Sequence, residues 1–197
     1  MPLTPFQKHK IRRLFSVLDV NRDGRVDRND YVRRVQGLAR LSGWTEGSPE
    51  YERNLQYVLQ EWESVRDSAD LDDSGAVTID EYLRYADIYL DDPDAVSAYA
   101  RGDVQLLFDA MDTDGDGAIT VNEYRAYLKA CGVDASAADV FFQHADTDKD
   151  GYITRDEMSQ AVEEFLSSED PNAPGNFMFG PLPPFEPAAG ESGGTQA

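Results

Sequence analysis

Apolar residues recur at helical spacing in front of short acidic segments of the chain. Ahead of Asp19 they lie eight, five, four and one residues earlier, and the same positions are apolar ahead of Asp112 and Asp146. This periodicity predicts amphipathic helices that each run into a loop. Ahead of a fourth segment, at Asp70, the stripe is interrupted by Arg66, which we expect to face solvent. The apolar positions of the three regular stripes are Ile11, Leu14, Phe15 and Leu18; Val104, Leu107, Phe108 and Met111; and Ala138, Phe141, Phe142 and Ala145.

Start and stop signals mark further helices. Thr4-Pro5 is a typical start for the first helix, and Ser48-Pro49 opens a long one that ends at Ala69. Asp92-Pro93 predicts a short linker helix to Arg101, broken by Gly102. Near the other end of the chain, Gly132 is expected to stop one helix, and Asp134 to cap the next.

The acidic segment from Asp112 to Glu123 has the spacing of a twelve-residue calcium loop. Calcium takes six to eight oxygen ligands at roughly 2.3–2.6 Å, and a short loop supplies them when alternate residues point inward. Acidic residues stand at loop positions 1, 3 and 5, and Gly117 stands at position 6, where the backbone turns sharply. The carbonyl group at position 7 and the long Glu123 side chain at position 12 complete the expected shell.

The same spacing occurs four times, which makes ordinary acidic turns an inadequate explanation. The expected metal ligands are, in the first loop, Asp19, Asn21, Asp23, the Arg25 carbonyl and Asp30; in the second, Asp70, Asp72, Ser74, the Ala76 carbonyl and Glu81; in the third, Asp112, Asp114, Asp116, the Ala118 carbonyl and Glu123; and in the fourth, Asp146, Asp148, Asp150, the Tyr152 carbonyl and Glu157.

Two loops depart from the regular pattern. Ser74 replaces the usual acid at position 5 of the second loop, and Asp30 replaces Glu at position 12 of the first. Because Asp is one methylene shorter, we expect the first loop to tolerate Mg²⁺ best. Position 8 is apolar in every loop, which predicts short β-contacts that pair the first loop with the second and the third with the fourth. The expected partners are Val26 with Val77 and Ile119 with Ile153.

Charge and composition narrow the function further. The net charge is −20, and the four loops contain 18 of the 38 acidic residues, so negative charge is concentrated where cations would bind. This acidity argues against nucleic acid or an anionic membrane as partner, and no apolar run is long enough to span a bilayer.

The single cysteine, Cys131, fits a reducing, cytoplasmic setting and an inert thiol. No nucleophile and base can be paired, so we do not expect an enzyme.

The C-terminal segment differs in kind from the rest. From Pro171 onward it is rich in Pro and Gly and has no periodicity, yet it contains the apolar cluster Phe177–Leu182. We expect this cluster to dock on the folded body and the residues after about Pro187 to be disordered.

The expected fold is all-α, a compact single body of four helix-loop-helix units in two pairs. Residues 1–92 are expected to form the first pair, 93–167 the second, and 168–197 a tail whose first part is docked. These units resemble the EF-hand superfamily over about residues 4–167. The uneven loop spacing, Asp30 at position 12 and the tail around Phe177 are similar to the sarcoplasmic calcium-binding protein and calerythrin branch. The excess of Arg over Lys suggests a bacterial source.

The resemblance implies a cytosolic, monomeric protein that buffers or transports Ca²⁺. Members of that branch usually bind three ions, and the intact second loop makes four possible here. One alternative is a calcium sensor that opens an apolar groove for a protein partner, although such grooves are Met-rich and this chain has four scattered Met residues. A remote alternative is a carrier of a small molecule of the luciferin type, for which the only histidines are His9 and His144.

Overall fold

The computed structural model describes residues 2–180 and 182. Its elements in chain order are α1 (Pro5–Leu18), β1 (Arg25–Asp27), α2 (Arg28–Ser42), α3 (Pro49–Ala69), β2 (Ala76–Thr78), α4 (Ile79–Tyr89), α5 (Pro93–Met111), β3 (Ile119–Thr120), α6 (Val121–Ala130), α7 (Ala137–Ala145), β4 (Tyr152–Ile153), α8 (Arg155–Ser167) and the 3₁₀ helix η1 (Pro174–Phe177). The expected all-α class is confirmed.

The helix that leaves each acidic loop begins with the same device. The residue at loop position 9 is its N-cap and accepts a hydrogen bond from the N–H at position 12, while the position-12 carboxylate accepts one from the N-cap N–H. This reciprocal capping box satisfies two N–H groups that a helix start leaves without partners. Each helix start is thereby fixed to a loop. The N-caps are Asp27, Thr78, Thr120 and Thr154.

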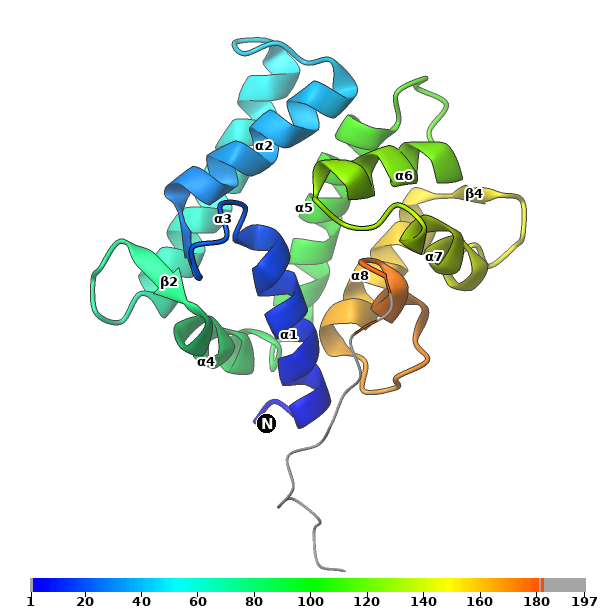
Figure 1. Ribbon diagram of the computed structural model, residues 1–197. Helices are drawn as coiled ribbons and strands as arrows, with labels where there is room; N and C mark the ends of the chain where they lie inside the picture. The colour runs from blue at the N-terminus through cyan, green and yellow to red at the C-terminus, as the bar shows by residue number, and fades with distance from the viewer. Residues whose placement is uncertain (1, 181, 183–197) are drawn as a thin grey trace, which may run out of the picture.

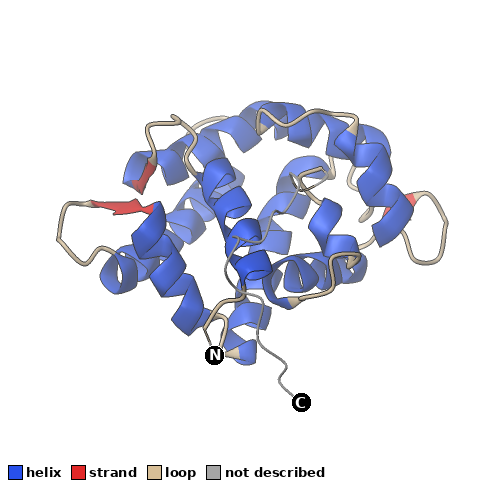
Figure 2. Cartoon of the chain, turned by 60° about the horizontal axis from the view of Figure 1, so that its bottom comes forward, coloured by secondary structure: helices blue, strands red, loops and turns tan. Residues whose placement is uncertain are grey.

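Short antiparallel strands join the loops in two pairs, as the sequence predicts. Val26 lies opposite Val77 between β1 and β2, and Ile119 lies opposite Ile153 between β3 and β4. All four side chains are fully buried. The two small sheets lie at opposite ends of the molecule (Figure 2).

The two pairs of helix-loop-helix units pack against each other around α5, which runs through the middle of the molecule (Figure 1). Helix α2 contacts α5 and α6, and α1 contacts α8. An ion pair between Arg34 of α2 and Asp103 of α5 joins the two halves, and Lys10 of α1 donates to the Glu164 and Ser168 carbonyls at the end of α8. One continuous core fills the body. The division of the chain at residues 92 and 167 stays a prediction.

The expectation that Gly102 breaks a short linker helix is wrong. Helix α5 runs without interruption from Pro93 to Met111, with Gly102 inside it. A Cβ at this position would overlap the ring and hydroxyl of Tyr57 on α3. The glycine costs about 1 kcal/mol of helix propensity, and its lack of a side chain makes room for an aromatic ring of the other half.

The start of α7 also differs from expectation. Its N-cap is Ser136, and Asp134 accepts a hydrogen bond from the Ser136 N–H in the preceding turn. Gly132 ends α6 as expected, with φ of +70° and with the Val133 N–H bonded to the Leu128 carbonyl.

The apolar cluster of the tail docks on the body, as predicted. Helix η1 packs between α7 and α8, and the Met178 and Phe179 side chains that follow it are buried. The Tyr124 hydroxyl donates to the Met178 carbonyl at 2.8 Å. Gly175 allows this contact, because a Cβ there would overlap the Ala161 carbonyl and lie 2.6 Å from the Phe165 nitrogen. The residues expected to be disordered, after about Pro187, lie outside the described part of the chain.

Among the described residues, none of the helices is long and apolar enough to cross a membrane.

Candidate metal centres

All four acidic loops adopt the same backbone turn. Positions 4 and 6 of each loop have positive φ, between 54° and 91°. Glycine adopts this conformation freely, which explains Gly24, Gly75, Gly117 and Gly151 at position 6. Position 4 is strained in three loops, because it carries a side chain there. The position-4 residues are Arg22, Asp73, Gly115 and Lys149.

The turn places the position-1 carboxylate under backbone N–H groups. In the third loop, Asp112 accepts from the Asp116 nitrogen at 3.1 Å and from the Gly117 nitrogen at 3.0 Å. The equivalent bonds occur in the other three loops. The N–H of position 5 also reaches the oxygen of the residue at position 3 in every loop. These bonds fix side-chain oxygens around one small space.

The position-12 glutamates are held at both oxygens. In the third loop, one oxygen of Glu123 accepts from the backbone and hydroxyl of Thr113, and the other from the backbone and hydroxyl of Thr120. The fourth loop repeats this arrangement around Glu157. Although burial raises the pKa of Glu123, these bonds outweigh it and keep the pKa below its usual value. The carboxylate is therefore charged and positioned at neutral pH.

Three loops bring a trio of carboxylates together. In each, one oxygen from positions 1, 3 and 12 lies within 4.8 Å of the other two. Oxygens that share an ion at roughly 2.4 Å must lie within about 5 Å of each other, so these trios have the spacing of a calcium site. They are Asp70, Asp72 and Glu81; Asp112, Asp114 and Glu123; and Asp146, Asp148 and Glu157.

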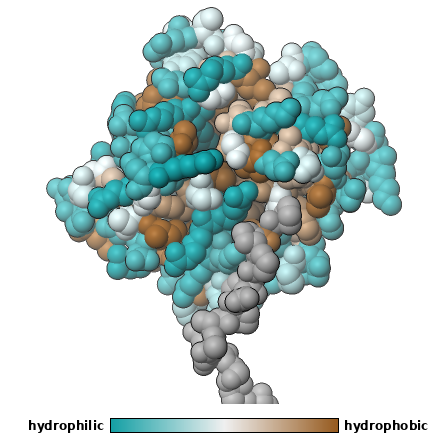
Figure 3. Space-filling model, in the orientation of Figure 1, coloured by the Kyte–Doolittle hydropathy of each residue, from teal (hydrophilic) through white to brown (hydrophobic). Residues whose placement is uncertain are grey.

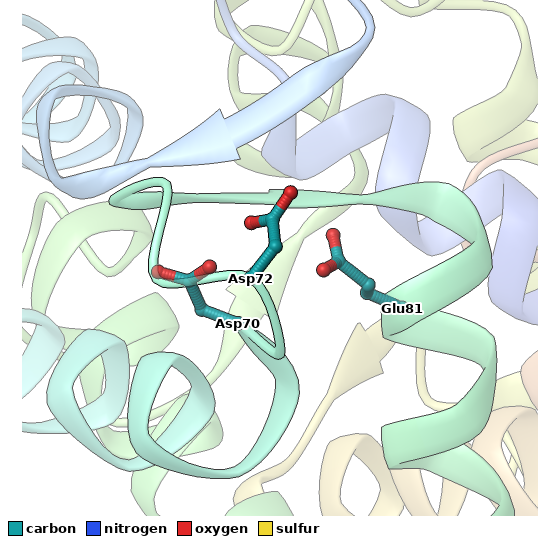
Figure 4. Close-up of side chains that lie close together, drawn as sticks. All are labelled: Asp70, Asp72 and Glu81. Atoms are coloured by element: carbon teal, nitrogen blue, oxygen red, sulfur yellow. The ribbon is translucent and has the colours of Figure 1, made fainter.

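The second loop forms such a trio despite its serine. Asp72 and Glu81 face each other across the loop, with Asp70 beside them (Figure 4). The Ser74 hydroxyl donates to the Ala76 carbonyl at 2.9 Å, so two of the expected ligands are in contact. Hydrogen bonds from Thr78 lower the pKa of Glu81. The loop thus keeps the geometry that a functional site needs.

The first loop is the exception. Asn21 stands at position 3, so an amide replaces one carboxylate of the trio. The shorter Asp30 accepts from the Asn21 nitrogen at position 3, where the glutamates of the other loops accept from position 2. Asp30 is 1% exposed, its burial raises its pKa, and Arg33 lies 3.4 Å from it. The ion pair with Arg33 was not anticipated from sequence, although the spacing of three residues on a helix is a usable signal.

The remaining expected ligands lie where the loops enter the strands. Arg25, Ala76 and Tyr152 are the first residues of β1, β2 and β4, and Ala118 immediately precedes β3. At position 5, Asp23, Asp116 and Asp150 each accept a bond from the N–H of position 7.

Two cavities lie apart from the carboxylate trios, and sequence reasoning identified neither. A cavity of about 370 Å³ opens between α1, α3, α4 and α5, and a cleft of about 270 Å³ separates α2 from the end of α6. The larger one is lined by the tyrosines Tyr31, Tyr57, Tyr82, Tyr85, Tyr89 and Tyr99, together with Glu61. Aromatic residues at helical spacing are normally interpreted as core packing, so the sequence pattern gives no sign of such a cavity.

Comparison with known proteins agrees with this geometry. The EF-hand domain pair family matches residues 8–87 and 103–163. The chain is 26% identical over 174 residues to the sarcoplasmic calcium-binding protein beta chain of Penaeus sp., covering 83% of this chain and 90% of the relative.

Solved structures of similar fold come from several sources. A Streptomyces coelicolor calcium-binding protein, described in terms of prokaryotic calcium-mediated regulation, is 25% identical with a TM-score of 0.69, covering 82% of this chain and 98% of that one. The Ca-loaded apo form of coelenterazine-binding protein from Renilla muelleri is 26% identical, with a TM-score of 0.66 and coverage of 90% and 96%. The amphioxus sarcoplasmic calcium-binding protein, at 22% identity, a TM-score of 0.74 and coverage of 92% and 100%, shows the same fold.

Proposed function

This chain belongs to the EF-hand domain pair family and is a calcium-binding protein, and we propose that it buffers or transports Ca²⁺ in the cytoplasm. Ions are held in the second, third and fourth loops by the carboxylate trios, together with the position-5 side chains and position-7 carbonyls. The first loop binds a further ion through Asp19, Asn21, Asp23, the Arg25 carbonyl and Asp30, with the greatest tolerance for Mg²⁺.

The observation that favours a buffer over a sensor is the docked tail. A sensor of this fold exposes an apolar groove to a partner helix when Ca²⁺ binds. Here η1 packs against both α7 and α8, and the Met178 and Phe179 side chains that follow it are buried. The ring of Phe177 also stacks on His144, with centroids 3.8 Å apart. A partner would have to displace these contacts, so the chain covers its own groove.

Hydrogen exchange at the tail tests this proposal. The amides of Met178 and Gly180 donate to the Gly175 and Phe177 carbonyls. If the protein is a buffer, these two amides stay protected from hydrogen exchange at low and at saturating Ca²⁺. A regulatory protein of the kind described from Streptomyces coelicolor is favoured instead if saturating Ca²⁺ removes the protection, because the tail then leaves its groove.

The tyrosine-lined cavity supports a second candidate function, that of a small-molecule carrier. Its volume of about 370 Å³ is within the usual range for ligand pockets. Burial raises the pKa of Glu61 to about 8, against the opposing effect of Arg34, whose Nη1 lies 3.7 Å from Glu61 Oε2. Neither histidine lines the cavity. Equilibrium dialysis with coelenterazine distinguishes the candidates, because a carrier retains one molecule per chain and a pure buffer retains none.

A further inference from the structure

A cleft between the two halves of the protein is lined by arginines. It has a volume of about 270 Å³ and lies between the end of α1, the first loop, α2 and the end of α6. Its cationic lining residues are Arg22, Arg33, Arg34 and Arg40, and its acidic ones are Asp19 and Asp103. Such a lining contrasts with the net charge of −20, and eight of the chain's 14 arginines lie between residues 12 and 40.

The two acidic groups do not neutralise this lining. Asp103 is paired with Arg34. Asp19 turns into the first loop, where its two oxygens accept from the Asp23 and Gly24 nitrogens at 3.1 and 2.9 Å. A cation bound in that loop would add positive charge at the edge of the cleft.

Two of the arginines have no acidic partner. Arg22 and Arg40 are exposed and make no ion pair with any described residue. The Arg22 guanidinium extends across the cleft, since a Cβ on Gly132 would lie 3.0 Å from its Nη2. Arg34, by contrast, is paired on both sides, since its Nη1 lies 3.7 Å from Glu61 Oε2 and its Nη2 contacts Asp103. Planar guanidinium groups of this kind bind carboxylates and phosphates through paired N–H donors.

The deeper wall of the cleft is apolar. Leu14, Val17 and Leu38 line it together with the rings of Tyr127 and Phe179. The face shown in Figure 3 is mostly hydrophilic, with hydrophobic patches scattered between the hydrophilic side chains. The cleft therefore combines an apolar wall with cationic side chains.

Gly37 keeps the cleft open at a cost to α2. It lies inside the helix, where glycine is about 1 kcal/mol less favourable than alanine. Its φ is not positive, and no heavy atom lies within 4 Å of the place a Cβ would take. Neither backbone strain nor close packing requires glycine here, in contrast to Gly102 and Gly175. A side chain at residue 37 would occupy the cleft, which is the one property that the glycine provides.

We propose that this cleft binds a small organic oxyanion with an apolar body, its carboxylate or phosphate held by Arg22 and Arg40. The volume is slightly below the range of roughly 300–1,000 Å³ for drug-sized ligands, so the ligand is small. This inference does not depend on whether the protein buffers, senses or transports.

The test is a titration of the full-length, Ca²⁺-saturated protein with hexanoate and with hexyl phosphate, followed by the amide resonance of Gly132. We expect saturable shifts with at least one of the two, and the tighter ligand identifies the head group. Acetate, which lacks the apolar body, and hexanol, which lacks the charge, should each bind at least tenfold more weakly. Equal binding of hexanol, or no saturable shift with either oxyanion, would overturn the proposal.

Four variants separate the effects of charge, shape and folding on binding. The double variant Arg22→Gln/Arg40→Gln should weaken binding at least tenfold, whereas Arg28→Gln, an exposed arginine outside the cleft, should change it less than twofold. Gly37→Leu should abolish binding by filling the cleft, and Gly37→Ala, which strengthens the helix, shows that α2 tolerates a side chain. Binding that survives both the double variant and Gly37→Leu would contradict the assignment to this cleft.

Discussion

The carboxylate of Asp30 accepts a hydrogen bond from the backbone nitrogen of Asn21 at 3.2 Å. The glutamates at the same loop position accept instead from the second residue of their loops, as Glu81 does from the Leu71 nitrogen. The Asp30 side chain, which is one methylene shorter, therefore contacts the loop residue one position further along the chain. We expect the shorter side chain to offer a bound ion fewer oxygens, which would suit the octahedral shell of Mg²⁺ better than the larger shell of Ca²⁺.

Asp30→Glu should accordingly raise the preference of the first loop for Ca²⁺ over Mg²⁺, by about tenfold. The reverse exchange, Glu81→Asp, is the matched control and should lower the preference at the second loop. Calorimetric Ca²⁺ titrations with and without millimolar Mg²⁺ measure both changes. A wild-type first loop that ignores Mg²⁺, or a selectivity that Asp30→Glu leaves as it was, would rule out side-chain length as the cause.

Glu123→Gln and Glu157→Gln should each weaken Ca²⁺ binding at their own site by at least tenfold and also weaken the paired site. Glutamine can keep the capping box, so the start of the helix is retained while the charged ligand is lost. Because Ile119 lies opposite Ile153 and joins the two loops, weaker ion binding in one loop should also weaken ion binding in the other. Calorimetry checks this, with Glu46→Gln in the exposed connector as control. If either loop variant titrates like wild type, its position-12 residue is not a ligand.

Gly175→Ala should release the tail, because the added methyl group cannot be accommodated against the α8 backbone at Ala161 and Phe165. Release exposes Met178, Phe179 and the apolar surface beneath them, so the emission of Nile red, a neutral dye, should rise in the Ca²⁺-bound protein. Deleting residues 171–197 should have the same effect. Asn172→Ala, an exposed position in the same segment, should leave the emission unchanged. If the dye signal does not change with Gly175→Ala or the deletion, the tail does not cover a groove.

Lys10→Met should destabilise the protein by about 1–3 kcal/mol at pH 7, because the half-buried Ser168 carbonyl loses its side-chain donor and the Glu164 carbonyl keeps only the Ser168 N–H. Burial lowers the pKa of Lys10 to about 8, against the opposing effect of Glu164 and Glu169. From pH 8 to about 10.5 the folded amine is neutral while the unfolded one stays protonated, so the stability of wild type rises with pH in that range.

The difference between wild type and Lys10→Met should therefore be larger at pH 10 than at pH 7. Denaturant unfolding of the Ca²⁺-bound proteins measures it, and the exposed Lys8→Met is the control. A difference that is constant from pH 7 to pH 10 would show that Lys10 does not titrate within the fold.

The features that the sequence predicted correctly depend on residues that are close together in the chain. The loop spacing, the helix caps and the apolar residue at loop position 8 each involve only a few neighbouring residues, so the pairing of Val26 with Val77 could be predicted from the sequence alone. The role of Gly102 could not, because it depends on Tyr57, a residue of another helix. The same holds for the Arg34–Asp103 pair and the arginine-lined cleft, which exist only once the two halves are packed together.

The most direct test of the buffering proposal is a Ca²⁺ titration of the full-length protein in which calorimetry and Nile red emission are recorded on the same samples. We predict that at least three ions bind per chain and that the emission stays level or falls as the loops fill, because the tail keeps the apolar groove covered. An emission that rises in step with Ca²⁺ binding would contradict the proposal, since it would mean that calcium opens the groove to a partner.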